Sequence, residues 1–188
     1  VLALSYFVAT FINTLIVCLF ASVLCFGYTA MVGWYFSFVD VLLILCDVVL
    51  LTLFGTLLAS IVNSFLTSQG QISAVGSIVS AGYGFICGAY MPISQFSKGL
   101  QNFVAFLPGT YGTSLLRNHS LRGVFAEMVD LGIPETSIDE MKNSIDCNIY
   151  FFENKVELSS MYIYLGATVL VLVLIYVLMN IKKRKVVR

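Results

Sequence analysis

Long runs of apolar residues dominate the chain and predict membrane-spanning helices. A helix needs about 20 apolar residues to cross about 30 Å of hydrocarbon. Runs that meet this requirement cover residues 1–28, 40–62, 72–90 and 160–181. We therefore expect an all-α, polytopic membrane protein with four spanning helices in a single transmembrane domain over residues 1–188.

The links between these runs indicate how neighbouring helices are placed. Residues 29–39 include Trp34 and Tyr35, amphipathic aromatics that are favoured at membrane interfaces. This link is short, so the first two helices should be antiparallel neighbours. Residues 63–71 have the polar composition of a turn.

A further uncharged stretch, residues 99–116, has Pro108-Gly109 at its centre. Proline inside a helix removes a backbone donor and clashes with the preceding turn. Two interpretations are open: a kinked fifth span, or two short helices that enter the membrane and return to the same side. Backbone that is not helical at membrane depth must be satisfied by protein or by a wet cavity.

Residues 123–158 are polar and carry eight carboxylates against two lysines, so we expect them outside the bilayer. Ser137 and Glu140 have the spacing of a capping box. Ile138, Met141 and Ile145 would share one face of the helix that follows. A short amphipathic helix is predicted there.

The charges at the C-terminus predict the orientation of the chain. The last apolar run is followed by Lys182, Lys183, Arg184 and Lys185. The positive-inside rule then places the C-terminus in the cytoplasm and the acidic segment 123–158 outside. If residues 99–116 are re-entrant, residues 63–71 and Val1 lie inside and residues 29–39 lie outside; if they span, all three reverse.

Composition agrees with a membrane protein, because 59% of the residues are hydrophobic and the mean hydropathy is +0.95. Both values are well above those of soluble domains. The chain begins with Val1, and its first apolar run lacks the basic flank and small-residue cleavage pattern of a signal peptide. We interpret it as part of a longer protein.

Asp40 and Asp47 are the only charged side chains in the first 97 residues. Seven residues separate them, which puts them on one helical face, with Asp47 about 10 Å deeper in the membrane. An intramembrane carboxylate is costly and therefore a candidate for function. It could instead order helix packing as a protonated or hydrogen-bonded acid. His119, the only histidine, is expected to be a solvated residue beside Arg117.

Small residues recur every four positions in the third apolar run, at Gly76, Ser80, Gly84 and Gly88. They would share one face of a helix and allow another backbone to approach closely. We expect a helix-packing seam there, and a substrate path beside the seam is the alternative.

Motifs for bond-making chemistry are absent from the sequence. It contains no H-E-x-x-H, G-x-S-x-G or G-x-x-x-x-G-K-[ST] pattern. We expect no enzyme activity, no cofactor or metal on this chain, and no nucleic-acid partner. Any ATP-driven cycle would need a phosphate-binding loop on another polypeptide.

Two stretches carry a resemblance to a known family. Residues 82–94 read Gly-Tyr-Gly-Phe-Ile-Cys-Gly-Ala-Tyr-Met-Pro-Ile-Ser, and residues 107–118 read Leu-Pro-Gly-Thr-Tyr-Gly-Thr-Ser-Leu-Leu-Arg-Asn. With the outer region 123–158 and the basic end of the last helix, this order resembles the C-terminal part of type 2 ABC transporter permeases. The resemblance covers essentially the whole chain.

The resemblance implies a fold in which residues 93–122 form re-entrant helices and the four spans are the family's third to sixth. The first two helices and their coupling helix would then be absent. Pro108, Gly109 and Tyr111 would lie near an outer gate, with Asp47 as a further pathway candidate.

The same resemblance implies the permease subunit of an ATP-driven exporter, a multi-pass protein of the bacterial plasma membrane that carries an amphipathic drug, lipid or similar compound. Its implied partners are a cytoplasmic ABC ATPase that binds ATP and Mg²⁺, a second permease copy in a homo- or heterodimer, and membrane lipid.

Other classes of function remain open. An ion-coupled secondary transporter or channel could use Asp47 and would need no ATP. A membrane scaffold or sensor could bind a partner through the acidic outer segment 123–158.

Overall fold

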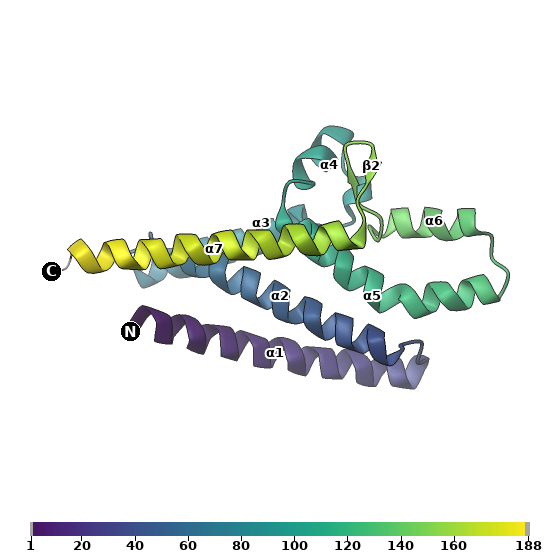
Figure 1. Ribbon diagram of the computed structural model, residues 1–188, viewed down its shortest axis with the longest axis horizontal. Coiled ribbons are helices and arrows are strands. Elements are labelled where there is room, and N and C mark those ends of the chain that lie inside the picture. Colours follow the sequence, from purple (N-terminus) through teal and green to yellow (C-terminus); the bar gives the residue numbers. More distant parts are fainter. Residues whose placement is uncertain (1, 187–188) are drawn as a thin grey trace.

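The computed structural model describes residues 2–186, and this part of the chain is almost entirely helical (Figure 1). It contains seven α-helices, one 3₁₀ helix and one two-stranded hairpin. The all-α class expected from the apolar runs is confirmed.

The first two helices, α1 (Leu2–Val32) and α2 (Phe38–Asn63), pack against each other as antiparallel neighbours (Figure 1). A capping box begins α2: the Asp40 N–H donates to Ser37 Oγ at 3.3 Å, and the Ser37 N–H donates to Asp40 Oδ2 at 2.9 Å. Each of these two hydrogen bonds satisfies a backbone N–H at the start of the helix that has no partner within the helix. The predicted neighbours are therefore confirmed, and Asp40 acts as a helix cap.

Among the described residues, three helical segments are long and apolar enough to cross a membrane: Leu4–Val32, Phe38–Asn63 and Leu158–Lys182. The last belongs to α7 (Leu158–Val186). These segments correspond to three of the four predicted spans and are compatible with a membrane-spanning protein.

The remaining predicted span, residues 72–90, the third of the four along the chain, is the helix α3 (Gln69–Ile86), which is not among these three segments. Its serines and glycines dilute its apolar character. It also ends sooner than expected, because Gly88 adopts a left-handed conformation with φ +80° and the Ala89 N–H turns back to the Gly84 carbonyl at 2.9 Å. This arrangement is a Schellman motif, a common way to end a helix at glycine.

Residues 93–122, predicted as re-entrant helices, form a 3₁₀ helix (Ile93–Gln95), α4 (Lys98–Val104) and the start of α5 (Pro108–Asp130). Pro108 lies in the first turn of α5. A backbone N–H at that position has no carbonyl partner within the helix, so proline costs no hydrogen bond there. The chain breaks into two helices before Pro108 and does not form one kinked helix. Helix α5 continues past residue 122 to Asp130.

The rest of the predicted outer segment contains α6 (Glu135–Ser144) and the hairpin of β1 (Tyr150–Phe151) and β2 (Asn154–Lys155). The short helix is confirmed, but its predicted capping box is wrong, because Pro134 precedes the first turn and leaves Ser137 inside the helix. Ile138 is buried against Phe125 and Cys147, whereas Met141 is exposed.

The main apolar core lies where α2, α5 and α7 pack on one another. Its centre combines Leu57 from α2, Leu115 from α5 and Leu165 from α7, all almost fully buried. The turn before α4 and the turn before the hairpin contribute Ile93 and Ile149. Helix α5 is thus held between two candidate spans.

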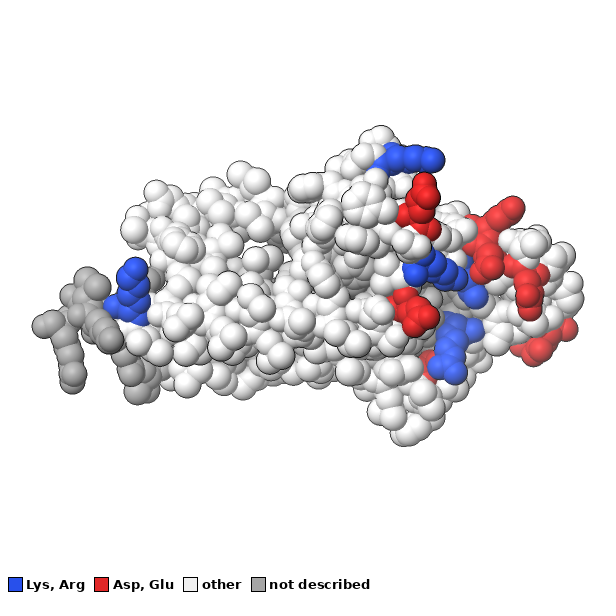
Figure 2. All heavy atoms as spheres, turned by 45° about the horizontal axis from the view of Figure 1, so that its top comes forward, with Lys and Arg blue, Asp and Glu red and all other residues white. Residues whose placement is uncertain are grey.

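The chain reverses at the two ends of the long axis of the molecule (Figure 1). The N-terminus, the turn between α2 and α3 and the end of α7 lie at one end, and the α1–α2 and α5–α6 links lie at the other. Charged side chains gather toward the second end, and the visible face between them and the basic end of α7 carries none (Figure 2). Along α7, this uncharged stretch from Ser159 to Ile181 corresponds to about 35 Å of helix.

Candidate functional site

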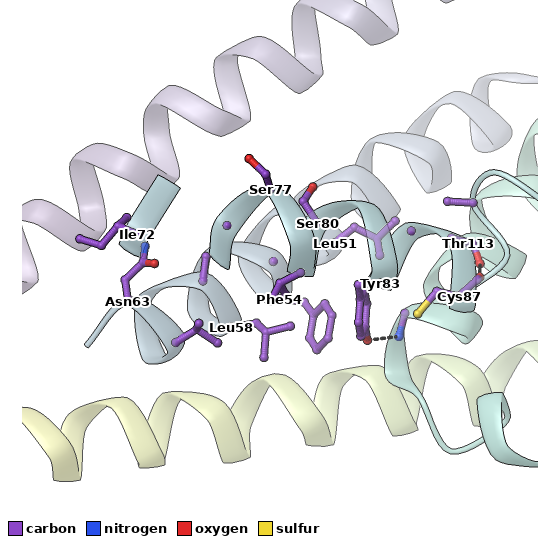
Figure 3. Close-up of a pocket in the computed structure, with 18 of the residues that line it drawn as sticks. Leu51, Phe54, Leu58, Asn63, Ile72, Ser77, Ser80, Tyr83, Cys87 and Thr113 are labelled. Carbon is purple, nitrogen blue, oxygen red and sulfur yellow. Dashed lines mark hydrogen bonds between the residues drawn. The ribbon is translucent and has the colours of Figure 1, made fainter. Parts of the chain in front are cut away.

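A hollow of about 750 Å³ lies between α2 and α3 (Figure 3). Its α2 wall is apolar and includes Leu51, Phe54 and Leu58. The α3 side adds hydroxyl groups, among them Ser77 and Ser80. Hollows of this size, mostly apolar with a few polar groups, are typical of sites for drug-sized molecules.

Three of the four residues of the predicted packing seam, Gly76, Ser80 and Gly84, line this hollow. No residue of α3 is buried against the rest of the described chain. Gly88, the fourth, lies beyond the helix in its left-handed turn. The small residues of α3 therefore border the hollow and are not covered by another helix of the described chain.

The first turn of α5 closes one end of the hollow. The Gly109 N–H donates to the Tyr83 hydroxyl at 3.1 Å, and the Thr113 hydroxyl donates to the Cys87 carbonyl at 2.8 Å (Figure 3). A Cβ on Gly109 would lie 2.6 Å from Tyr83 Cε1 and 2.8 Å from Cys87 Sγ. Glycine is thus required for this close approach of α5 to α3.

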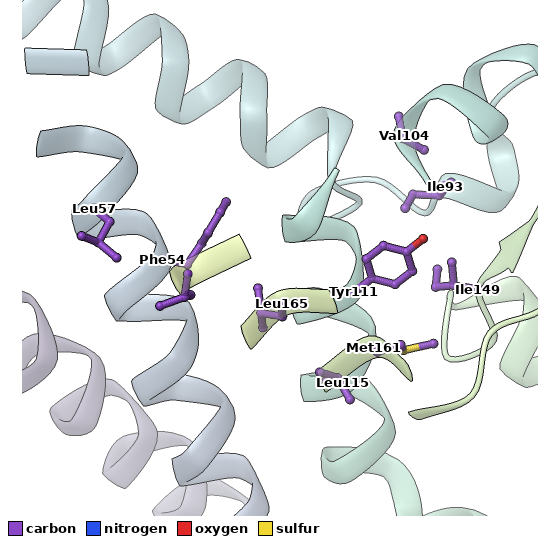
Figure 4. Packing of buried hydrophobic residues seen from close by; sticks show 10 residues of the cluster. Phe54, Leu57, Ile93, Val104, Tyr111, Leu115, Ile149, Met161 and Leu165 are labelled. Atoms are coloured by element: carbon purple, nitrogen blue, oxygen red, sulfur yellow. The ribbon is translucent and has the colours of Figure 1, made fainter. Parts of the chain in front are cut away.

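Tyr111, another gate candidate, is buried in the main core and does not line the hollow (Figure 4). Its hydroxyl donates to the Ala105 carbonyl at 2.5 Å, and its ring packs edge-on to Tyr164 at 5.0 Å between centroids. The Thr110 hydroxyl bonds the Val104 carbonyl at 2.8 Å. Both side chains tie the end of α4 to the start of α5, and Pro108 begins the helix that they hold.

Asp47 is almost fully buried, with 1% of its surface exposed, and its carboxylate has two side-chain partners. His119 Nδ1 lies 2.6 Å from Oδ2, and the Tyr162 hydroxyl donates to Oδ1 at 2.5 Å. Asp47 belongs to α2, His119 to α5 and Tyr162 to α7. The rings of His119 and Tyr162 stack with 6.0 Å between their centroids. Asp47, His119 and Tyr162 are called the acid cluster below.

The prediction for His119 is wrong, because only 4% of its surface is exposed. The sequence offered little signal for its pairing, since 72 residues separate it from Asp47. Chemically, the acid cluster can hold one mobile proton between a carboxylate and an imidazole, or form an ion pair when the imidazole is protonated. It also joins three helices through a buried polar network, which is costly to break.

A second contact between α2 and α5 lies about 10 Å farther along α2, toward its start. There, Arg122 Nη1 lies 3.4 Å from Asp40 Oδ1. Asp40 is buried, but the Arg122 side chain is mostly exposed. Each carboxylate of the first 97 residues thus has one partner on α5.

A clasp around Asp146 joins the turn after α3 to the segment between α6 and the hairpin. Its carboxylate accepts the backbone N–H groups of Ile93 at 2.5 Å and Ser94 at 3.0 Å, and Arg117 Nη1 lies 3.2 Å away. Arg117 also donates to the Gly88 carbonyl. Asp146, Arg117, Ile93, Ser94 and Gly88 are called the Asp146 clasp.

Cys147 is buried beside this clasp, where Ser114 and Asn118 of α5 donate to its carbonyl. Burial raises the pKa of its thiol to about 11, against the opposing influence of Arg117 and Lys142. The clasp has no local signal in the sequence, because its members come from four separate segments.

The fold and these sites define an all-α protein with three apolar helices of membrane-spanning length, a lined hollow and buried polar contacts between helices. No family model, no curated protein and no solved structure matches the chain.

Proposed function

We propose that this chain is the permease part of an ATP-driven ABC exporter and that the hollow between α2 and α3 is part of the path for an amphipathic cargo. The observation that carries the proposal is the hollow itself, with its apolar α2 wall and its hydroxyl-bearing α3 side. A compound with an apolar body and a few polar groups fits such a lining.

The order of elements supports the same assignment. A helix of small residues, a short broken pair, an outer segment and a final helix with a basic end follow one another in α3, α4–α5, α6 with the hairpin, and α7. In this proposal α3 also crosses the membrane, as the third of four spans, and α4 with the start of α5 is the re-entrant pair. The basic end of α7 is cytoplasmic, and residues 131–157 are outside.

Motion of α5 would open or close the hollow at its first turn, where Gly109 meets Tyr83. ATP binding and hydrolysis belong to a separate ATPase subunit with its own phosphate-binding loop and Mg²⁺. A second permease copy would complete the path, and the exposed face of α3 is available to border it.

The proposal is tested by transport in proteoliposomes that contain the full-length protein with its co-purified ATPase. Two amphipathic probes, rhodamine 6G and a short-chain fluorescent phospholipid, are loaded and their ATP-dependent movement is followed. Movement that stops when the P-loop lysine of the ATPase is replaced supports an exporter. Absence of any co-purifying ATPase, together with movement of neither probe, would refute it.

A matched pair of variants tests the hollow. Gly55 lines it, and a Cβ at this position meets nothing within 4 Å, so Gly55→Leu should reduce the volume of the hollow. We expect transport of the probes to fall roughly fivefold or more. Gly27→Leu, on the exposed surface of α1, is the control, because a Cβ there also meets nothing within 4 Å. Equal transport in both variants would remove the hollow from the path.

A second candidate function is an ion-coupled carrier, which the acid cluster favours. A buried carboxylate paired with the only histidine of the chain can bind and release a proton. This function predicts probe movement that follows a proton gradient without ATP and is abolished by a protonophore. Dependence on ATP alone would exclude it.

A further inference from the structure

Three exposed phenylalanines pack together where α4 ends and the β-hairpin turns, and a fourth, Phe103, lies in the last turn of α4. Phe106 packs edge-on against Phe151, with 5.2 Å between ring centroids, and its ring lies 6.5 Å from that of Phe152. Phe151 and Phe152 also contact each other at 5.1 Å. Phe103, on α4, is 61% exposed. Phe103, Phe106, Phe151 and Phe152 are called the aromatic platform.

A hydrogen bond sets the level of this platform along α7. The Tyr164 hydroxyl donates to the Phe106 carbonyl at 2.8 Å. Tyr164 lies about 10 Å along α7 from Glu157, the last acidic residue before the apolar run. The platform is therefore held beside the first turns of a candidate span, at the depth where aromatic side chains collect at a membrane interface.

The turn of the hairpin gives a second reason to expect a partner for these rings. Phe152 has φ +55°, a conformation that glycine, asparagine and aspartate adopt more readily in two-residue hairpin turns. Its side chain is 57% exposed. A strained backbone that presents an aromatic ring to water is unfavourable, whereas the same ring in an interface is stabilised.

The neighbouring charge argues for an interface over a buried protein contact. Glu153 follows Phe152 at the tip of the hairpin and is exposed. A carboxylate at that point is tolerated among hydrated headgroups but is costly inside a dry apolar contact. The rings can therefore enter the lipid only to the depth at which the Glu153 carboxylate remains hydrated.

We infer that the aromatic platform docks on the lipid bilayer, inserting its rings into the interface of the leaflet that surrounds the first turns of α7. The partner is the lipid of the membrane in which the chain itself lies. This docking would hold α4 and the start of α5 at a set depth while α7 spans. It depends on α7 crossing a membrane and is independent of ATP, cargo and direction of transport.

The inference is tested by tryptophan fluorescence of the full-length protein in phosphatidylcholine–phosphatidylglycerol vesicles. In a background of Trp34→Phe, which removes the only tryptophan, single variants Phe152→Trp and Phe103→Trp report the platform. Leu131→Trp is the control, because it is 73% exposed but lies in the α5–α6 link, away from the platform.

We expect blue-shifted emission from both platform variants and a roughly twofold loss of fluorescence with lipids brominated near the glycerol end of the acyl chain. Bromine near the methyl end should quench less, and Leu131→Trp should not be quenched by either. Water-like emission without quenching would overturn the inference. Blue-shifted emission without quenching would also overturn it, because the rings would then contact protein, such as a second copy.

Discussion

Gly109 and Asp47 are the two residues whose surroundings leave the least room for substitution. Gly109 has no room for a side chain between Tyr83 and Cys87. Asp47 has no access to water and depends on His119 and Tyr162 for its hydrogen bonds. Each residue joins helices that are far apart in sequence, so each change should affect packing between helices.

Gly109→Ala should destabilise the protein by about 1–3 kcal/mol, because the new methyl group overpacks the contact between α5 and α3. The measurement is the free energy of unfolding in mixed detergent micelles. Gly99→Ala is the matched control: it lies in α4, and a Cβ there meets nothing within 4 Å. It should be neutral or stabilise by up to about 1 kcal/mol. Equal effects of the two variants would contradict the close contact at Gly109.

Asp47→Ala and His119→Ala should each destabilise the protein, because each leaves a buried polar partner unpaired. In a double-mutant cycle we expect a coupling energy of about 1–2 kcal/mol. The control cycle pairs Asp40→Ala with His119→Ala, since Asp40 is paired with Arg122. That cycle should show a coupling near zero. Strictly additive effects of Asp47→Ala and His119→Ala would show that the contact contributes nothing to stability.

At the scale of elements, the molecule depends on two kinds of contact around α5. The first half of α5 packs in the apolar core between α2 and α7, and hydrogen bonds of its hydroxyl groups hold it there. Farther along α5, Arg117 takes part in the Asp146 clasp, which connects the turn after α3 to the segment after α6. The clasp positions α4 and the start of α5 relative to the segment after α6, so breaking it should loosen this region while the candidate spans remain folded.

Asp146→Ala should expose Cys147, because two backbone donors and Arg117 lose their shared acceptor. The pKa of the thiol, raised by burial to about 11, would fall toward its ordinary value. Only the thiolate is alkylated, so modification by iodoacetamide at about pH 8 should speed up roughly tenfold or more. The rate is measured by mass spectrometry of the peptide that contains Cys147.

Asp139→Ala is the control for this experiment, since Asp139 is an exposed acid on α6. It should leave the alkylation rate of Cys147 unchanged. In the parent protein, the rate should rise with pH up to about 11, because the thiolate fraction grows until the pH reaches the pKa. A parent protein that reacts as fast as the unfolded chain would contradict the burial of Cys147.

At the scale of the whole molecule, the arrangement of ends predicts a topology. The N-terminus, residues 64–68 and the end of α7 lie together, opposite the α1–α2 and α5–α6 links (Figure 1). This grouping is the one expected if α3 crosses the membrane and the α4–α5 pair returns to the side from which it entered. A fifth span would instead place residues 64–68 with the α5–α6 link.

Labelling of single cysteines in a cysteine-free background tests this topology. Phe65→Cys and Leu131→Cys are both at exposed positions of links. A membrane-impermeant maleimide should label Leu131→Cys on intact cells and Phe65→Cys only after permeabilisation. Labelling of both on intact cells would show that residues 99–116 are a fifth span.

Much of the architecture followed from local properties of the sequence. The apolar runs that became α1, α2 and α7 were predicted because hydrophobic length and the absence of charge are properties of a continuous segment. The short helix α6 was predicted from another local property, the helical spacing of Ile138, Met141 and Ile145. The end of α3 was missed because it depends on one left-handed glycine, Gly88, in a run that remained apolar on both sides.

The sequence by itself determined the all-α class, three apolar helices of spanning length and a polar stretch over residues 123–158, since these depend on composition and periodicity along the chain. It also marked Asp47 as a costly residue without naming its partners. Only the tertiary structure decided that His119 is buried beside Asp47, that α3 faces a hollow and that Asp146 holds a clasp. These features join residues tens of positions apart, and such contacts are set by how helices pack in space.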